Sequence, residues 1–193
     1  MRGILLALES RFPMRKYLLP YLACGLLFAL MLSGCAHKLP PTGICPATGF
    51  IDNTDTVTYL AANPVLGAGE KNVVVRGSIN GYRGSCSFDK KKNAVEVDLK
   101  VPFVAQKGPA GAHLKKQVFP YFIAVLSPAN EILQRQAFTT TVDFDSNENG
   151  ENTEDHAIKI PLAHNSHGAA DYKVIVGFAL THAQYAYNKE RKK

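Results

Sequence analysis

The sequence lacks the short motifs that mark the common catalytic and cofactor-binding sites. It contains no Gly-x-Ser-x-Gly that would present a nucleophilic serine, no Cys-x-x-Cys, and no glycine-rich loop that could cradle a phosphate. The serines beside Cys86 lie within an expected strand rather than on a strained turn. Glu96 and Asp98 alternate with apolar residues, which places them on the solvent side of another strand. These absences favour a non-catalytic protein without a cofactor.

A large excess of one charge is also missing. The net charge is +6, but residues 1–34 contain four basic residues and one acidic residue, so the rest of the chain carries only +3. The basic clusters at residues 90–92 and 189–193 fall in an expected turn and at the end of the chain, where charges are usually solvated. Nucleic-acid binding requires basic residues gathered on one face. The sequence therefore argues against a nucleic-acid partner.

The chain does contain a long apolar run near its start. Two basic residues at 15–16 precede a mostly apolar stretch over residues 17–31, and small residues follow, which is the pattern of a secretory signal. Residues 32–35, Leu-Ser-Gly-Cys, resemble the lipobox of bacterial lipoprotein precursors at all four positions. The resemblance implies diacylglycerol on the sulfur of Cys35, cleavage before this residue and acylation of the new amine. Met14 is the expected translation start.

An uncleaved membrane anchor is the alternative for this segment. About 20 apolar residues are needed to span a bilayer as a helix. Residues 17–34 fall near the low end of the permitted range and include Pro20. We therefore favour cleavage and lipidation.

This interpretation divides the chain into three parts. We expect a signal peptide over residues 1–34, a lipidated tether over 35–44 and one folded domain over 45–193. The residue after Cys35 is Ala36 rather than Asp. By resemblance to the lipoprotein sorting rule, this implies anchoring in the outer membrane, with the domain facing the periplasm.

Two cysteines remain once the signal and the lipid are accounted for. Cys24 leaves with the signal and Cys35 carries the lipid, so Cys45 and Cys86 are left. Two cysteines in an oxidising compartment predict one disulfide. A metal site is the competing interpretation, but no Cys-x-x-Cys and no nearby pair of histidines supports it.

From Asn72 onward, apolar residues recur at every second position, which is typical of strands. The clearest strand presents five inward residues: Val95, Val97, Leu99, Val101 and Phe103. Asn-Gly at residues 80–81 predicts a β-hairpin, residues 119–126 predict a central strand covered on both faces, and residues 181–184 have the spacing of a helix capping box. The pattern indicates an all-β fold: an antiparallel sandwich of about seven strands with a short C-terminal helix.

Three short segments resemble known families. Residues 168–174 are similar to the penultimate-strand region of immunoglobulin-like and fibronectin type III domains, in which a tyrosine, here Tyr172, ties a corner. The tryptophan and cysteine spacing of antibody domains is absent, since the chain has no tryptophan. Residues 121–125 and 176–181 resemble segments of small proteobacterial envelope lipoproteins. These resemblances imply an immunoglobulin-like sandwich in the cell envelope.

One motif has the residue types of a cation site. Residues 145–150, Asp-Ser-Asn-Glu-Asn-Gly, fit the start of a calcium loop, in which Gly150 would permit the sharp turn. The side-chain oxygens would come from Asp145, Asn147 and Asn149. The twelfth position is His156 rather than the bidentate Glu of such loops. The alternative is a plain hydrophilic loop over residues 145–155.

Two functions follow from these observations. The first is a lipid-anchored, non-catalytic structural or interaction module, which docks to an envelope protein through an exposed sheet edge or loop. The alternative is an envelope domain that binds a small ligand or calcium through residues 145–155. In both cases the protein contacts the membrane through its N-terminal lipid.

Overall fold

The computed structural model describes residues 45–64, 67, 69–89, 91–162 and 169–191. The predicted signal peptide, the predicted tether and Cys35, the predicted site of the lipid, lie outside these residues. Within the described part of the chain, none of the helices has the length and apolar character required to cross a bilayer.

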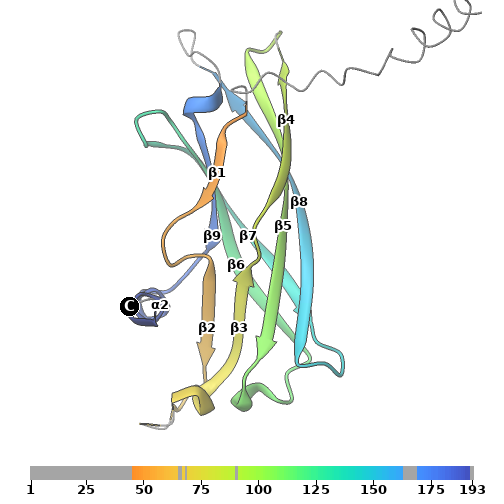
Figure 1. Ribbon diagram of the computed structural model, residues 1–193, viewed down its shortest axis with the longest axis vertical. Helices are drawn as coiled ribbons and strands as arrows, with labels where there is room; N and C mark the ends of the chain where they lie inside the picture. The colour runs from red at the N-terminus through yellow and green to blue at the C-terminus, as the bar shows by residue number, and fades with distance from the viewer. Residues whose placement is uncertain (1–44, 65–66, 68, 90, 163–168, 192–193) are drawn as a thin grey trace, which may run out of the picture. The chain divides into compact units, whose positions relative to one another are not determined.

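The described residues form nine strands in two sheets, with an α-helix at the C-terminal end (Figure 1). Sheet I contains, in spatial order, β1 (Ala47–Phe50), β9 (Lys173–Phe178), β6 (Lys116–Leu126) and β7 (Ile132–Asp143). Sheet II contains β2 (Thr56–Leu60), β3 (Val73–Ile79), β5 (Ala94–Lys107) and β4 (Arg83–Asp89), and β8 (Asn149–Pro161) also pairs with β5. Helix α2 covers His182–Arg191, and the short 3-10 helices are η2 (Gly69–Asn72), η3 (Pro109–Gly111) and η4 (Ala169–Asp171).

The predicted all-β sandwich with a C-terminal helix is confirmed. The strand count exceeds the expected seven because β1 and β2 lie before Asn72, where the regular alternation of apolar residues begins. Strand β1 pairs with β9 in parallel, whereas the other strand pairs in the described residues are antiparallel. Tyr172, the expected corner residue, is buried directly before β9, which is the last strand described.

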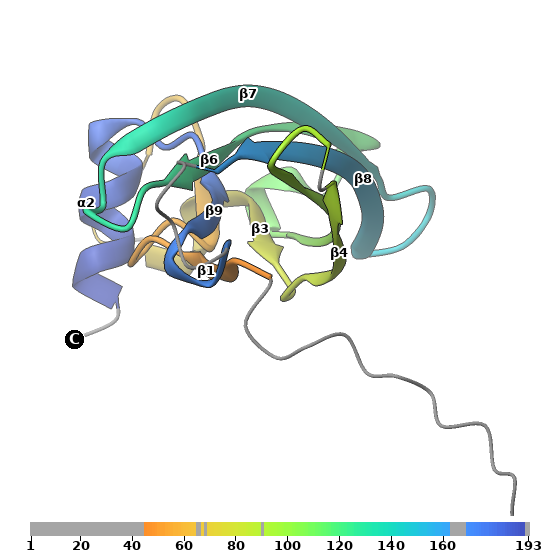
Figure 2. The same cartoon turned by 90° about the horizontal axis from the view of Figure 1, so that it is seen from above.

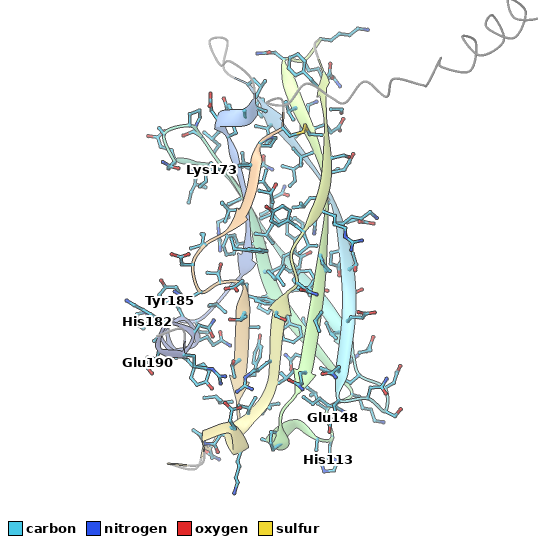
Figure 3. All side chains as sticks on the ribbon, in the orientation of Figure 1. His113, Glu148, Lys173, His182, Tyr185 and Glu190 are labelled. Atoms are coloured by element: carbon cyan, nitrogen blue, oxygen red, sulfur yellow. A yellow bond between two sulfur atoms is a disulfide. The ribbon has the colours of Figure 1, made fainter. Side chains whose placement is uncertain are left out.

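Side chains from both sheets fill the space between them (Figure 3). The five alternating apolar residues of β5 all point inward, and none is more than 4% exposed. At the centre, the ring of Phe103 packs on Tyr121 and Phe178, with centroids 4.7 and 5.9 Å apart. Figure 2 shows the strands curving around this common interior, with α2 beside β2. The predicted central strand at residues 119–126 is confirmed as part of β6, which lies between β9 and β7.

The hairpin predicted at residues 80–81 is wrong. Strand β3 pairs with Phe103–Lys107 and β4 pairs with Ala94–Lys100, so both lie antiparallel to β5. Because β8 occupies the other edge of β5, β3 and β4 follow one another along the same edge. Gly81, at φ +85°, offsets the chain without reversing it.

The expectation of a polar loop as far as residue 155 is also wrong. Strand β8 begins at Asn149 and pairs with β5 over thirteen residues. The sequence shows no apolar alternation here, because three inward positions of β8 carry polar residues: Asn152, Glu154 and His156. These side chains form hydrogen bonds on the inner side of the strand, so β8 tolerates them there.

Candidate functional site

One cavity lined by described residues lies on the outer face of sheet II, beside α2. Strand register places two rows of side chains across this face. One row contains Thr58, Arg76, Gln106 and Asn149, and the next contains Thr56, Ser78 and Val104. Asn188 and Arg191 of α2 line its side, and the volume is about 450 Å³. We call this cavity the α2 groove.

Helix α2 is held in place by its cap and by one buried amide. The predicted capping box is confirmed, because the backbone N–H of Gln184 donates to Thr181 Oγ1 at 3.2 Å and the Gln184 side chain accepts from the Thr181 backbone N–H at 2.9 Å. Asn188 is 4% exposed, and its Nδ2 donates to the carbonyls of Asn53 and Thr56 at 2.9 and 2.7 Å. This pair of bonds fixes the helix against β2 and so shapes one wall of the groove.

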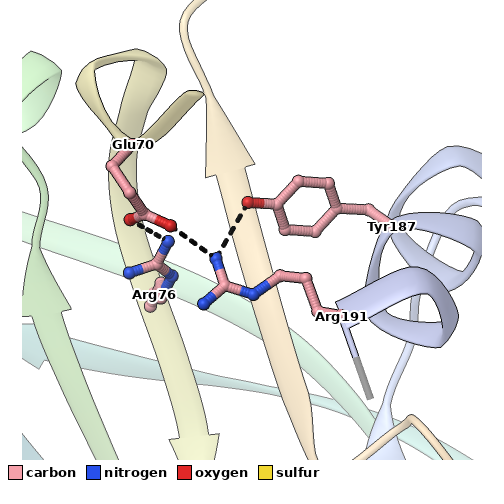
Figure 4. A network of polar contacts seen from close by, with 4 residues as sticks. All are labelled: Glu70, Arg76, Tyr187 and Arg191. Carbon is pink, nitrogen blue, oxygen red and sulfur yellow. Dashed lines mark hydrogen bonds and ion pairs between the residues drawn. The ribbon is translucent and has the colours of Figure 1, made fainter. Parts of the chain in front are cut away.

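Two guanidinium groups meet one carboxylate at the rim of the groove (Figure 4). Glu70 of η2 accepts from Arg76 Nη2 at one oxygen and from Arg191 Nη1 at the other, the latter at 2.8 Å. Tyr187 Oη lies 3.1 Å from the same Arg191 nitrogen. Hydrogen bonds from Arg76 and then Arg191 lower the pKa of Glu70, and bonds to Tyr187 and Glu70 raise the pKa of Arg191. The cluster therefore keeps a net positive charge.

Arg76 is the less exposed of the two arginines that line the groove. It stands between Thr58 and Gln106 in the polar row, and its side chain is 33% exposed. Its Nε is buried and donates to no described protein group. Since buried donors are nearly always paired, Glu70 alone does not satisfy this guanidinium.

The predicted disulfide is confirmed. Cys45 and Cys86 are bonded, with their Cα atoms 5.7 Å apart. The bridge joins the segment before β1 to β4, and therefore links sheet I to sheet II. Cys86 is half-buried and packs against the core.

The residues of the calcium pattern occupy a tight turn and the start of a strand. Residues 144–147 form a turn in which the Asn147 N–H donates to the Phe144 carbonyl at 2.7 Å and Asp145 has φ +44°. Asn149 is already part of β8 and pairs with Gln106. Among the described residues, no three His, Cys, Asp or Glu side chains are grouped so that they could hold a metal ion.

A second polar cluster lies between β7 and β8. Glu154 Oε1 accepts hydrogen bonds from Thr140 and Asn152 at 2.8 and 2.9 Å, and Tyr121 Oη lies 2.7 Å from His156 Nε2. Burial raises the pKa of Tyr121, which keeps its hydroxyl protonated. With a neutral His156, this hydroxyl donates to the ring. These bonds satisfy polar groups inside the sandwich, which is a structural role.

This cluster makes stability depend on pH. Burial lowers the pKa of His156, although the carboxylates of Glu154 and Asp155 oppose the shift. As the pH falls below about 6.5, the unfolded chain therefore takes up a proton before the native protein does. We expect the free energy of unfolding to be level above neutral pH and to decrease as the pH is lowered through this range. Urea unfolding at a series of pH values from neutral to mildly acidic measures the slope.

A His156→Gln variant is the control for this prediction. Glutamine can still accept the Tyr121 hydrogen bond, but it does not titrate, so the slope should disappear. A wild-type stability that stays level, or a variant that keeps the slope, would contradict the assignment.

The sequence did not reveal the α2 groove. Its residues come from four strands and α2, and only the register brings the strand residues into rows. A signal was present in β3, where Arg76 interrupts an otherwise apolar or small-residue run. That pattern indicates an outer-face residue, but it does not identify the residues that flank it in neighbouring strands.

Comparisons with known proteins identify no family for this chain. No family model matches the sequence, and no curated protein matches it. Among solved structures, the variable (V) domain of the AgI/II polypeptide BspA from Streptococcus agalactiae aligns with 11% identity, over 69% of this chain and 78% of that one. Its TM-score is 0.19, which is too low to support an argument about fold or function.

Proposed function

We propose that the protein is an outer-membrane lipoprotein whose sandwich faces the periplasm and acts there as a non-catalytic interaction module of the cell envelope. The observation that carries the proposal is the bond between Cys45 and Cys86. Disulfides persist in oxidising compartments and are rare in the cytosol. The bond thus supports the export that the lipobox at residues 32–35 implies.

The edge of sheet I supports the interaction part of the proposal. Strand β7 is the outermost strand of that sheet, so its backbone groups on one side are not engaged in sheet I. At its start, Ile132 and Leu133 are 64% and 53% exposed. An edge of this kind can accept an added strand, and exposed apolar residues beside it increase the area that a partner would bury.

Lipidation is tested by replacing the proposed attachment residue. We expect Cys35→Ser to abolish incorporation of radiolabelled palmitate and to release the protein from envelope fractions, because serine has no thiol to form the thioether. Cys24→Ser is the matched control, since Cys24 should leave with the signal, and it should label and fractionate as wild type. Mass spectrometry of the mature N-terminus measures the cleavage site directly.

Palmitate that never enters the wild-type protein, or a mature chain that still begins at Met14 or Met1, would refute the lipoprotein assignment. The interaction part is tested separately, by photo-crosslinking from Leu133 in intact membranes. Failure to crosslink any envelope protein from this edge would refute it while leaving the lipid anchor intact.

A further inference from the structure

We propose that the α2 groove binds a hydroxylated carboxylic acid of the sugar-acid class, with Arg76 and Arg191 holding its carboxylate. This inference does not rest on the lipid anchor, so the failure of one leaves the other standing. Its starting point is the cluster of Figure 4, in which one carboxylate joins two guanidinium groups that come from β3 and α2.

The carboxylate class follows from the side chain that now occupies this position. The two oxygens of Glu70 each accept from a different arginine, so the guanidinium groups are separated by the span of one carboxylate. The Glu70 side chain is 62% exposed and sits on a four-residue 3-10 helix with no buried residue. It can move aside without disturbing the core. The Glu70 carboxylate thus occupies the position that the carboxylate of a ligand would take.

The lining of the groove selects the rest of the ligand. Half of the residues that line it carry a hydroxyl or amide side chain: Thr56, Thr58, Ser78, Gln106, Asn149 and Asn188. None of the described residues that line it is aromatic, so it offers no stacking surface to a flat ring. Its volume of about 450 Å³ falls in the range of small-molecule sites. A ligand with several hydroxyl groups and one acid group matches both the lining and the size.

The groove is already organised for binding. Arg76 is held in its row by strand pairing on both sides, and Asn188 fixes the helix that carries Arg191. The backbone positions of both arginines are therefore fixed before binding, which reduces its cost. Arginine also suits this role because its planar fork matches a carboxylate.

The test is a calorimetric titration of the full chain with glucuronate. We expect saturable binding that Arg191→Gln weakens by about tenfold or more, because it removes a charged donor. Arg191 is a rim residue, so this variant should stay folded. Glu70→Gln should bind more tightly than wild type, since it removes the internal competitor. Lys71→Gln, which neutralises the neighbouring exposed residue of η2, should bind as wild type does.

Two comparison ligands make the outcome decisive. Glucose lacks the acid and should bind far more weakly than glucuronate, and inorganic phosphate lacks the hydroxylated body and should compete poorly. The proposal is overturned if neither wild type nor Glu70→Gln binds glucuronate, if Arg191→Gln binds it unchanged, or if glucose binds equally well. Phosphate that competes as strongly as glucuronate would overturn the sugar-acid assignment.

Discussion

Replacing Cys45 and Cys86 together by serine is expected to lower the free energy of unfolding by about 4 kcal/mol. The bridge closes a loop over a sequence separation of 41 residues, and the chain-entropy model assigns about this value to a loop of that length. Its effect should be large because β4 has few other attachments. No residue of β4 is fully buried, and among the described strands β4 pairs with β5 alone. The bridge supplies the connection that burial supplies elsewhere.

Urea unfolding under non-reducing conditions measures the loss. Ser85→Ala and Ser87→Ala are matched controls on exposed positions of the same strand, and they should change the stability little. Adding dithiothreitol should destabilise wild type by a similar amount and leave the double variant unchanged. A loss below about 1 kcal/mol in the double variant would show that β4 is held mainly by its pairing with β5.

Gly150→Ala should have the next largest effect on stability, lowering the free energy of unfolding by about 3 kcal/mol. A Cβ at this position would lie 2.2 Å from the carbonyl oxygen of Asp143 and 2.7 Å from Val142 Cγ1. The oxygen belongs to the backbone of β7 and cannot move aside as a flexible side chain can. Gly49→Ala is the control, because a Cβ on Gly49 in β1 would meet nothing within 4 Å. Thermal or urea unfolding of the two variants gives the comparison.

This prediction also decides between two explanations of the same glycine. In a calcium loop Gly150 would be needed for the turn around the ion, whereas here it is needed for the close approach of β7 to β8. The packing explanation is contradicted if Gly150→Ala is as stable as wild type. A calcium-dependent rise in melting temperature that only the wild type shows would also contradict it.

Local sequence patterns predicted the strands with alternating apolar residues and the helix with a capping box, since neither feature depends on residues that are distant in sequence. The inward residues of β5 and the capping box before α2 are of this kind, because side-chain period and backbone caps depend on nearby sequence. Residues 80–81 show the limit. Asn-Gly favours a tight reversal locally, but fourteen residues of β5 provide one edge along which β3 and β4 both pair. The pairing with β5 overrides the turn preference.

Partners distant in sequence also explain what was missed in β8 and in the α2 groove. A glutamate at position 154 is typical of a loop in the sequence. In the structure it lies on the inner side of β8, because Thr140 and Asn152 donate hydrogen bonds to it. In the sequence Arg76 is indistinguishable from an ordinary surface arginine, because only the strand register places it beside Thr58 and Gln106. The disulfide was predictable because the interpretation of residues 1–35 as a lipoprotein signal left two cysteines to pair. Sequence alone therefore located the bridge but could not assemble the groove.

The position of the Cys45–Cys86 bond determines how the domain would respond to mechanical tension. A pull on the chain before Cys45 passes through the two sulfur atoms directly into β4, because that bond closes the loop that contains β1, β2 and β3. These three strands are thus shielded from extension. Ala47 of β1 lies only two residues after Cys45, so the β1–β9 and β4–β5 pairings carry the force together while the bond is intact. Strand β1 therefore cannot be pulled away from β9 without also loading β4.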